Sequence, residues 1–174
     1  MQKYHLIIIS LLFTTCVSSA QQNFVEARAC NVNYDQLEVV FDRGTRMSTY
    51  SLDGKPFTGC AEQDVVENEM YYLHYVKDGK LERQIGYYYS GQKCRDYNFK
   101  NGVAHGTLEL FYGDGSPYIY EEYKDGKLHG ILKRWRKGQL VREAKFWYGT
   151  MMSEQLNEAE QELTEEEMKL GGNC

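Results

Sequence analysis

Residues 123–149 read YKDGKLHGILKRWRKGQLVREAKFWYG, and this stretch contains the pattern that decides the fold. It holds four glycines, of which Gly126, Gly138 and Gly149 are expected to lie in turns. Asp125-Gly126 is a strong β-hairpin signal, because both central residues of a type I′ turn require positive φ. The stretch therefore predicts short strands joined by tight turns.

The glycines recur through the chain in two interleaved series. Members of each series are 23 to 25 residues apart. The first series is Gly54, Gly79, Gly102, Gly126 and Gly149, and the second is Gly91, Gly115 and Gly138. Self-similarity at a fixed spacing is typical of repeat proteins. We therefore expect residues 50–150 to form stacked antiparallel β-hairpins with a period of about 24 residues, each holding two turns and two strands.

Large apolar residues hold fixed places before these glycines. One column comprises Val76, Phe99, Tyr123 and Phe146, and the other comprises Tyr88, Phe111 and Trp135. We expect both columns to share one face of the sheet and to form its core, since each aromatic ring buries on the order of 150 to 250 Å². The 15 tyrosines fit a sheet with one packed and one wet face, although an exposed aromatic binding surface would also use them.

The phrase at residues 123–130, followed by Trp135 and Gly138, resembles the MORN repeat. It is more similar still to the bacterial MORN-variant proteins that are often labelled antitoxin-like. Residues 53–59, DGKPFTG, match an opening phrase common in that family. The resemblance covers roughly residues 50–150. It implies an elongated, twisted, single-layer antiparallel sheet and a role in protein binding, lipid binding or toxin neutralisation.

The N-terminus has the layout of a secretory signal peptide. Lys3 precedes an apolar run, and small residues end at Ala20, so we expect cleavage after residue 20 and a periplasmic or extracellular protein. A buried N-terminal helix, or a lipoprotein acylated at Cys16, is the alternative. Residues 21–49 depart from the period and are expected to cap the first hairpin, with a strand at 37–42.

The C-terminal segment, residues 151–174, is expected to form an acidic helix. Ser153 is a good N-cap, glutamates are frequent, and Gly171-Gly172 would end the helix before the chain terminus. This helix would cap the last hairpin near Phe146 and Trp147. An acidic segment that docks on a basic partner, or that is partly disordered, is the alternative.

Four cysteines remain after the expected cleavage: Cys30, Cys60, Cys94 and Cys174. An even number in an exported chain favours disulfides, in one of three pairings, with free buried thiols as the alternative. None of the cysteines is spaced as a zinc site would require, and no cofactor is expected.

The composition argues against several functions. Residues 21–152 carry 18 basic and 18 acidic residues, whereas nucleic-acid binding requires a basic face. No nucleophile elbow or phosphate-binding loop is present, and Asp78, Asp114 and Asp125 adjoin turn glycines, where Asp stabilises the turn. His105 and His129 occupy equivalent positions before a glycine and are expected to have structural roles.

We therefore expect no catalytic or metal-binding residues. The sequence favours an exported, non-enzymatic module that binds another protein or serves as a scaffold in the cell envelope. The alternatives are an antitoxin or immunity protein, and a membrane-lipid-binding protein. The acidic segment at residues 153–174, with seven Glu and one Lys, disfavours anionic lipid.

Overall fold

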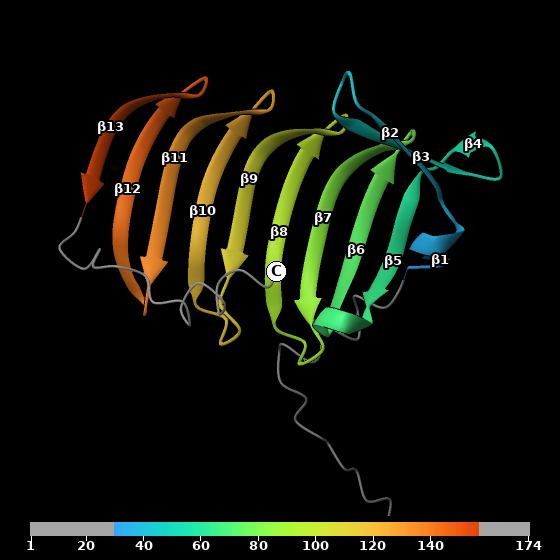
Figure 1. The fold of residues 1–174 in the computed structure, drawn as a ribbon, viewed down its shortest axis with the longest axis horizontal. Coiled ribbons are helices and arrows are strands. Elements are labelled where there is room, and N and C mark those ends of the chain that lie inside the picture. The colour runs from blue at the N-terminus through green and yellow to red at the C-terminus, as the bar shows by residue number, and fades with distance from the viewer. Residues whose placement is uncertain (1–29, 157–174) are drawn as a thin grey trace, which may run out of the picture.

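The computed structural model describes residues 30–156 and consists mainly of β-strands in two open sheets (Figure 1). Ten strands form the large sheet in the order β1-β5-β6-β7-β8-β9-β10-β11-β12-β13, and three form the small sheet β2-β3-β4. Every neighbouring pair is antiparallel except β1 and β5. From β5 onward the strands follow chain order, so the large sheet is a stack of hairpins.

The small sheet and its surroundings contain β1 (Val32–Asn33), the 3-10 turn η1 (Tyr34–Gln36), β2 (Glu38–Asp42), β3 (Met47–Leu52) and β4 (Lys55–Pro56). The large sheet continues with β5 (Gly59–Val65), the 3-10 turn η2 (Val66–Asn68), β6 (Met70–Lys77), β7 (Lys80–Tyr88), β8 (Lys93–Lys100), β9 (Val103–Phe111), β10 (Pro117–Lys124), β11 (Lys127–Arg136), β12 (Gln139–Trp147) and β13 (Thr150–Leu156). No α-helix occurs between residues 30 and 156.

All eight glycines of the two series have positive φ, between 70° and 87°. In the first series the preceding residue also has positive φ, as at Asp125 (52°), which is the geometry of a type I′ turn. The turns at Gly91 and Gly115 differ, because only the glycine has positive φ. There the glycine N–H donates to the carbonyl three residues earlier, of Tyr88 and Tyr112 respectively.

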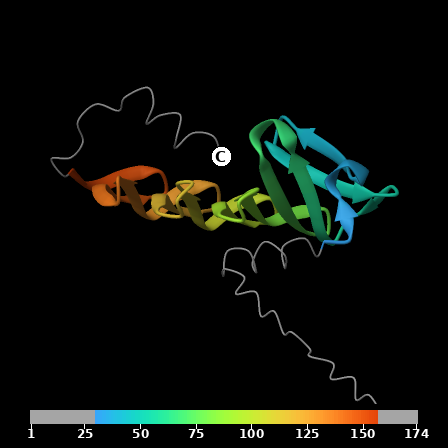
Figure 2. The same cartoon turned by 90° about the horizontal axis from the view of Figure 1, so that it is seen from below.

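One face of the large sheet carries the small sheet, and we call it the arginine face after Arg95, Arg134 and Arg142. These three residues belong to one cross-strand row that also contains Leu110 and Ile119. Residues directly opposite each other in a sheet point to the same side. Figure 2 shows the small sheet stacked on one side of the large sheet at its N-terminal end, whereas the rest remains a single layer.

The buried core is concentrated where the two layers meet. Between the sheets, the cluster comprises Leu37, Tyr50, Phe57, Ala61 and Val76. A neighbouring cluster on the same face joins Met70, Tyr72 and Cys94. On the opposite face, Tyr71, Leu73, Ile85 and Tyr87 pack against the two cysteines of a disulfide. β6 therefore contributes buried side chains to both faces.

The expected single-layer architecture is correct for β8–β13 but not for the N-terminal end. The reason lies in residues 37–57, whose apolar side chains cover β5–β7 with a second sheet. The strand expected at 37–42 is present as β2.

The expected C-terminal helix does not begin at Ser153. Residues 153–156 belong to β13, which pairs with β12 from Trp147↔Thr150 to Arg142↔Leu156. The hydrogen bonds offered by the exposed edge of β12 replace those of a first helical turn, so pairing overrides the local helix signal. The rest of the expected helix lies outside the described residues, as do the expected signal peptide and Cys16. No helix capable of crossing a bilayer occurs within residues 30–156.

Candidate binding surface at the open end of the sheet

Successive turns of the first glycine series lie side by side and form what we call the turn edge. The N–H of Gly102 donates to the carbonyl of Leu81, and the N–H of Gly126 donates to that of Ala104. The N–H of Gly149 donates likewise to the carbonyl of Leu128. Each turn is thus bonded to the hairpin before it, which joins the hairpins along one edge of the sheet.

The two equivalent histidines, His105 and His129, accept hydrogen bonds from the turns of this edge. The backbone N–H of Asp125 donates to Nδ1 of His105 at 3.5 Å, and that of Tyr148 donates to Nδ1 of His129 at 3.4 Å. The ring of His129 also packs against Trp147 and Tyr148, with centroids 4.4 and 4.6 Å apart. Their imidazoles therefore hold the next turn in place, as a structural role requires.

The first apolar column stays on the arginine face but differs in burial along the sheet. Val76 is buried between the two sheets, whereas Phe99, Tyr123 and Phe146 are half-buried. Without a second layer above β8–β13, their rings keep one side open. They are absent from the buried clusters, which lie at the two-layer end.

The second column is divided between the faces, which corrects the expectation of a single face. Tyr88 packs with Tyr72 on the arginine face. Phe111 follows Leu110 of the arginine row and so points the other way, where Lys93 Nζ lies 5.4 Å from its ring centroid. Gly86 pairs with Arg95 and Arg95 with Leu110, so Tyr88, two residues after Gly86, shares the face of Leu110 and not that of Phe111. Trp135, which follows Arg134 in β11, lies on the same side as Phe111.

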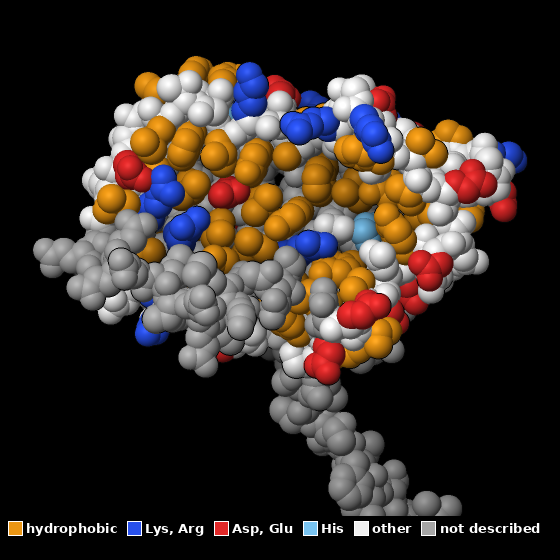
Figure 3. All heavy atoms as spheres, viewed as in Figure 1, with side chains coloured by type: hydrophobic (Ala, Val, Ile, Leu, Met, Phe, Trp, Pro, Cys, Tyr) orange, Lys and Arg blue, Asp and Glu red, His pale blue; other side chains and the backbone are white. Residues whose placement is uncertain are grey.

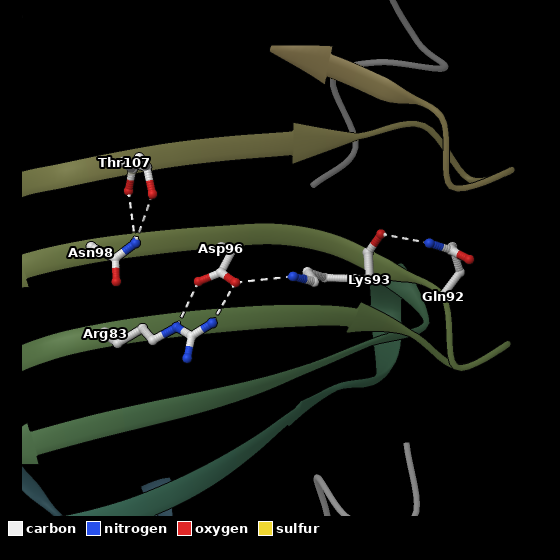
Figure 4. Close-up of polar contacts among 6 residues, drawn as sticks. All are labelled: Arg83, Gln92, Lys93, Asp96, Asn98 and Thr107. Atoms are coloured by element: carbon white, nitrogen blue, oxygen red, sulfur yellow. Dashed lines mark hydrogen bonds and ion pairs between the residues drawn. The ribbon is translucent and has the colours of Figure 1, made fainter. Parts of the chain in front are cut away.

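Asp96 is the most deeply buried carboxylate described, and it is held by two cations (Figure 4). Arg83 donates from Nε and from a terminal nitrogen to the two carboxylate oxygens at 2.8 and 2.6 Å, and Lys93 lies at 3.1 Å. Burial alone would raise the pKa of Asp96, but the bonds from Arg83 and Lys93 lower it. The cluster is a satisfied ion-pair network on the face opposite the arginine row.

His74 is the other buried polar residue, on the arginine face beneath the small sheet. One ring nitrogen lies 3.1 Å from Gln63 Oε1 and the other 3.3 Å from Gln84 Nε2, while the ring lies 4.5 Å from that of Tyr34. Burial, assisted by the positive charge of Arg95, lowers its pKa to about 4. His74 is therefore a neutral packing residue near pH 7.

The expected cysteines are partly brought together. Cys30 and Cys60 form a disulfide with a Cα–Cα distance of 5.1 Å. Cys94 is fully buried and is itself disulfide-bonded. Cys174 lies outside the described residues. The Cys30–Cys60 bond is compatible with an oxidising compartment.

Within residues 30–156, no three His, Cys, Asp or Glu side chains lie together as metal ligands would. The acids beside turn glycines act locally: Asp114 Oδ1 accepts hydrogen bonds from the backbone N–H and the hydroxyl of Ser116. These bonds lower the pKa of Asp114.

An exposed apolar surface at the open end of the sheet was not anticipated. Within the described chain, β13 pairs with β12 and has no strand on its other side. The large apolar residues exposed there, which we call the terminal patch, are Trp147, Tyr148, Met151, Met152 and Leu156. Trp147 is 60% exposed and Met152 67%. Several exposed large apolar residues beside an open strand edge are typical of interaction sites.

A hollow of about 290 Å³ adjoins this patch. It is lined by Gly130, Ile131, Lys145, Phe146, Trp147 and Met152. Gly130 has a φ of 116°, which suits glycine, and the place of its missing side chain is occupied by Glu122. A register shift between Lys145 and Phe146 makes Met152 the additional residue on β13. The hollow can therefore receive an apolar side chain from a partner that approaches the edge.

The sequence did carry a signal for this patch. Residues 146–152 read FWYGTMM, which places five large apolar residues around a turn in the outermost hairpin. The expected C-terminal helix would cover these residues, so their exposure was not predicted. Comparison of the sequence with protein-family models and with curated proteins gives no match in either case.

Proposed function

We propose that this chain is an exported, non-enzymatic MORN-type repeat protein that binds another protein through the terminal patch. The observation that carries the proposal is the conjunction of an unpaired strand edge with exposed Trp147 and Met152. In this arrangement, a partner segment in extended conformation adds a strand to β13, and one of its apolar side chains enters the adjoining hollow.

The chemistry of the patch favours protein over lipid as the partner. Lys145 is the one basic residue lining the hollow, whereas binding to anionic membranes uses clusters of four or more basic residues. Main-chain hydrogen bonds along β13 would supply affinity, and the hollow would supply selectivity. The partner would be an envelope component or a toxin that the protein neutralises, and the Cys30–Cys60 disulfide supports the exported location.

The experiment compares two exposed apolar positions of similar accessibility. A photo-crosslinking amino acid at position 152, or at position 40 as the control, identifies proteins in contact with each site in intact cells. Val40 in β2 is 62% exposed, close to the 67% of Met152, but lies at the other end of the molecule. We expect one protein to be crosslinked from position 152 and not from position 40.

The purified partner is then titrated against Met152→Lys and Val40→Lys. A charge at position 152 should weaken binding at least tenfold, because it places an ammonium group beside the hollow, whereas Val40→Lys should bind as the parent does. Equal affinity of both variants would overturn the proposal. So would flotation of the parent with anionic vesicles that is lost on Met152→Lys, since lipid would then be the ligand.

A further inference from the structure

The arginine face has cations without matching anions. Arg134 and Arg142 are directly opposite each other in β11 and β12. Like charges in this position repel, and Glu154 compensates Arg142 at 2.7 Å. Arg134 has no carboxylate partner among residues 30–156, and its Nε is buried without a hydrogen bond.

Arg95 extends this cationic row towards the two-layer end. Its guanidinium lies 4.1 Å from the ring centroid of Tyr72 and 5.3 Å from that of Tyr97. Its Nε also donates no hydrogen bond. Between Arg95 and Arg134 lie Leu110 and Ile119, so the row is cationic at both ends and apolar between them. Figure 3 shows this face, with hydrophobic side chains spread over the strands and basic side chains among them.

Cys94 directly precedes Arg95, the first residue of this row, in β8. It packs with Met70 and Tyr72, and Tyr72 is the ring on which Arg95 stacks. Cys94 is disulfide-bonded, and Cys30 and Cys60 are bonded to each other. Its partner is therefore Cys16 or Cys174, and Cys16 would be lost with the expected signal peptide.

We propose that the C-terminal segment, residues 157–174, crosses the arginine face and is fixed there by a disulfide between Cys174 and Cys94. The segment has the complementary charge, with six Glu and one Lys, and apolar residues such as Leu163 that suit the middle of the row. It begins after Leu156, whose cross-strand partner is Arg142 of the same row.

The length of the segment permits this path. Five strand spacings separate β13 from β8, which amounts to about 24 Å at roughly 4.8 Å per spacing. The 18 residues from 157 to 174 can extend to about 60 Å at roughly 3.3 Å each. The chain can therefore reach Cys94 while its glutamates lie beside Arg134 and Arg95.

Formation of the bond is an oxidation that needs an acceptor. The thiols of Cys94 and Cys174 lose two protons and two electrons as the S–S bond forms. A disulfide of a thiol oxidase protein, the class of oxidant found in exported compartments, accepts both electrons and becomes a dithiol by thiol–disulfide exchange.

The pairing is tested by mass mapping of the full chain, purified without reductant after free thiols have been alkylated. We expect one proteolytic peptide pair that joins residues 94 and 174 and separates on reduction. An alkylated Cys174, or a peptide that links Cys94 to any other cysteine, would overturn the pairing.

Docking on the arginine face is tested separately, by the rate at which a glutamate-specific protease cuts residues 157–174. We expect cleavage at least tenfold slower in the oxidised parent than in Cys174→Ser, which leaves the sheet unaltered. Arg134→Glu should accelerate cleavage several-fold while the disulfide remains. Lys100→Glu, a charge change at an exposed residue of β8 that alternates away from the arginine face, is the control and should leave the rate unchanged. Equal rates for the parent and Arg134→Glu, or equal acceleration by both charge reversals, would overturn docking on this face.

Discussion

Strands β5–β7 and strands β9–β13 belong to one sheet, but they bury their side chains differently. In β6, six of eight residues are buried, because the small sheet covers one face and the Cys30–Cys60 cluster lies on the other. In β10 no residue is buried, and in β13 all seven are exposed. The two-layer region therefore behaves as a conventional core, while the single-layer region depends on cross-strand neighbours and on the turn edge.

The difference shows how one sheet can combine stability with accessible surface. Burial in two layers gives β5–β7 the hydrophobic stabilisation that a hairpin stack alone lacks. The two-layer region anchors the single-layer strands through cross-strand pairing. These strands can therefore leave the arginine face and the terminal patch accessible to other chains. Variants in the two regions should accordingly differ in effect.

The largest expected effect comes from truncating a core residue of β6. Leu73→Ala should lower the free energy of unfolding by about 4 kcal/mol, because Leu73 is 1% exposed and a cavity would remain. Leu110→Ala, in the single-layer row of β9, should cost about 1 kcal/mol, since water can fill the space. Urea denaturation monitored by tryptophan fluorescence measures both. Equal losses would contradict the assignment of the core to the two-layer end.

Acid pH should weaken the two-layer region through His74. The folded-state pKa of about 4 lies below the ordinary 6.5, so the unfolded chain binds more protons between these values. Stability is then fully present above pH 6.5 and falls progressively down to about pH 4, by on the order of 3 kcal/mol. Unfolding at a series of pH values should show this slope in the parent and lack it in His74→Gln.

The lowered pKa of Asp96 acts in a separate window. The stabilisation from its ionised form is present above the ordinary value of 3.8 and is lost as pH falls through the lower folded value. Asp96→Asn should therefore remove pH dependence below about pH 4 and leave the His74 slope in place. If His74→Gln and Asp96→Asn each removed the whole pH dependence of stability, the two groups would not titrate independently.

Gly130→Ala tests the single-layer region. An added methyl would overlap the carboxylate of Glu122, which accepts a hydrogen bond from the N–H of Ile131 at 2.8 Å. We expect it to cost about 2 kcal/mol more than Gly138→Ala, whose site has positive φ but open space. Thermal unfolding of both variants measures this difference, which combines the overlap with Glu122 and the larger conformational cost of φ 116° against 76°. Equal losses would contradict both contributions at Gly130.

The smallest expected effect concerns the turn edge. His129→Ala removes the acceptor of the Tyr148 N–H, at a net cost of about 1 kcal/mol. Hydrogen exchange should show faster exchange at Tyr148 but not at Asp125, which relies on His105. Faster exchange at both would indicate that the two histidines do not act locally.

The turns could be predicted because their determinants are local. Positive φ at Asp125 and Gly126 follows from the Asp-Gly pair itself, and the same holds for Asn101-Gly102. The faces of the strands could not be predicted equally well. Tyr88 and Phe111 are not equivalent, because the N–H groups that close the two turns on Gln92 and Ser116 are those of Tyr88 and Tyr112. Spacing to the glycine alone does not reveal this equivalence.

The ends of the chain show where local signals lose to pairing. Ser153 and Glu154 favour a helix start, but the free edge of β12 offers backbone hydrogen bonds over seven residues. The second layer was equally hidden, since the apolar residues of 47–57 do not reveal that they pack on β5–β7. The terminal patch could be predicted from the apolar residues of 146–152, but only if no C-terminal helix is expected to cover them.

The backbone hydrogen bonds that the last three turns of the turn edge donate run in one direction along the chain. Gly102, Gly126 and Gly149 each donate to the hairpin that precedes them, and never to the one that follows. The N-terminal end of the stack therefore supports the C-terminal end. During synthesis, each hairpin leaves the ribosome after the hairpin that accepts its hydrogen bond. Shortening the protein from its C-terminus should remove hairpins one at a time and leave a folded remainder, while loss of residues 30–77 would remove the support of every later hairpin. Lineages that carry more or fewer hairpins should accordingly differ at the tip, where a unit can be added without disturbing those already in place.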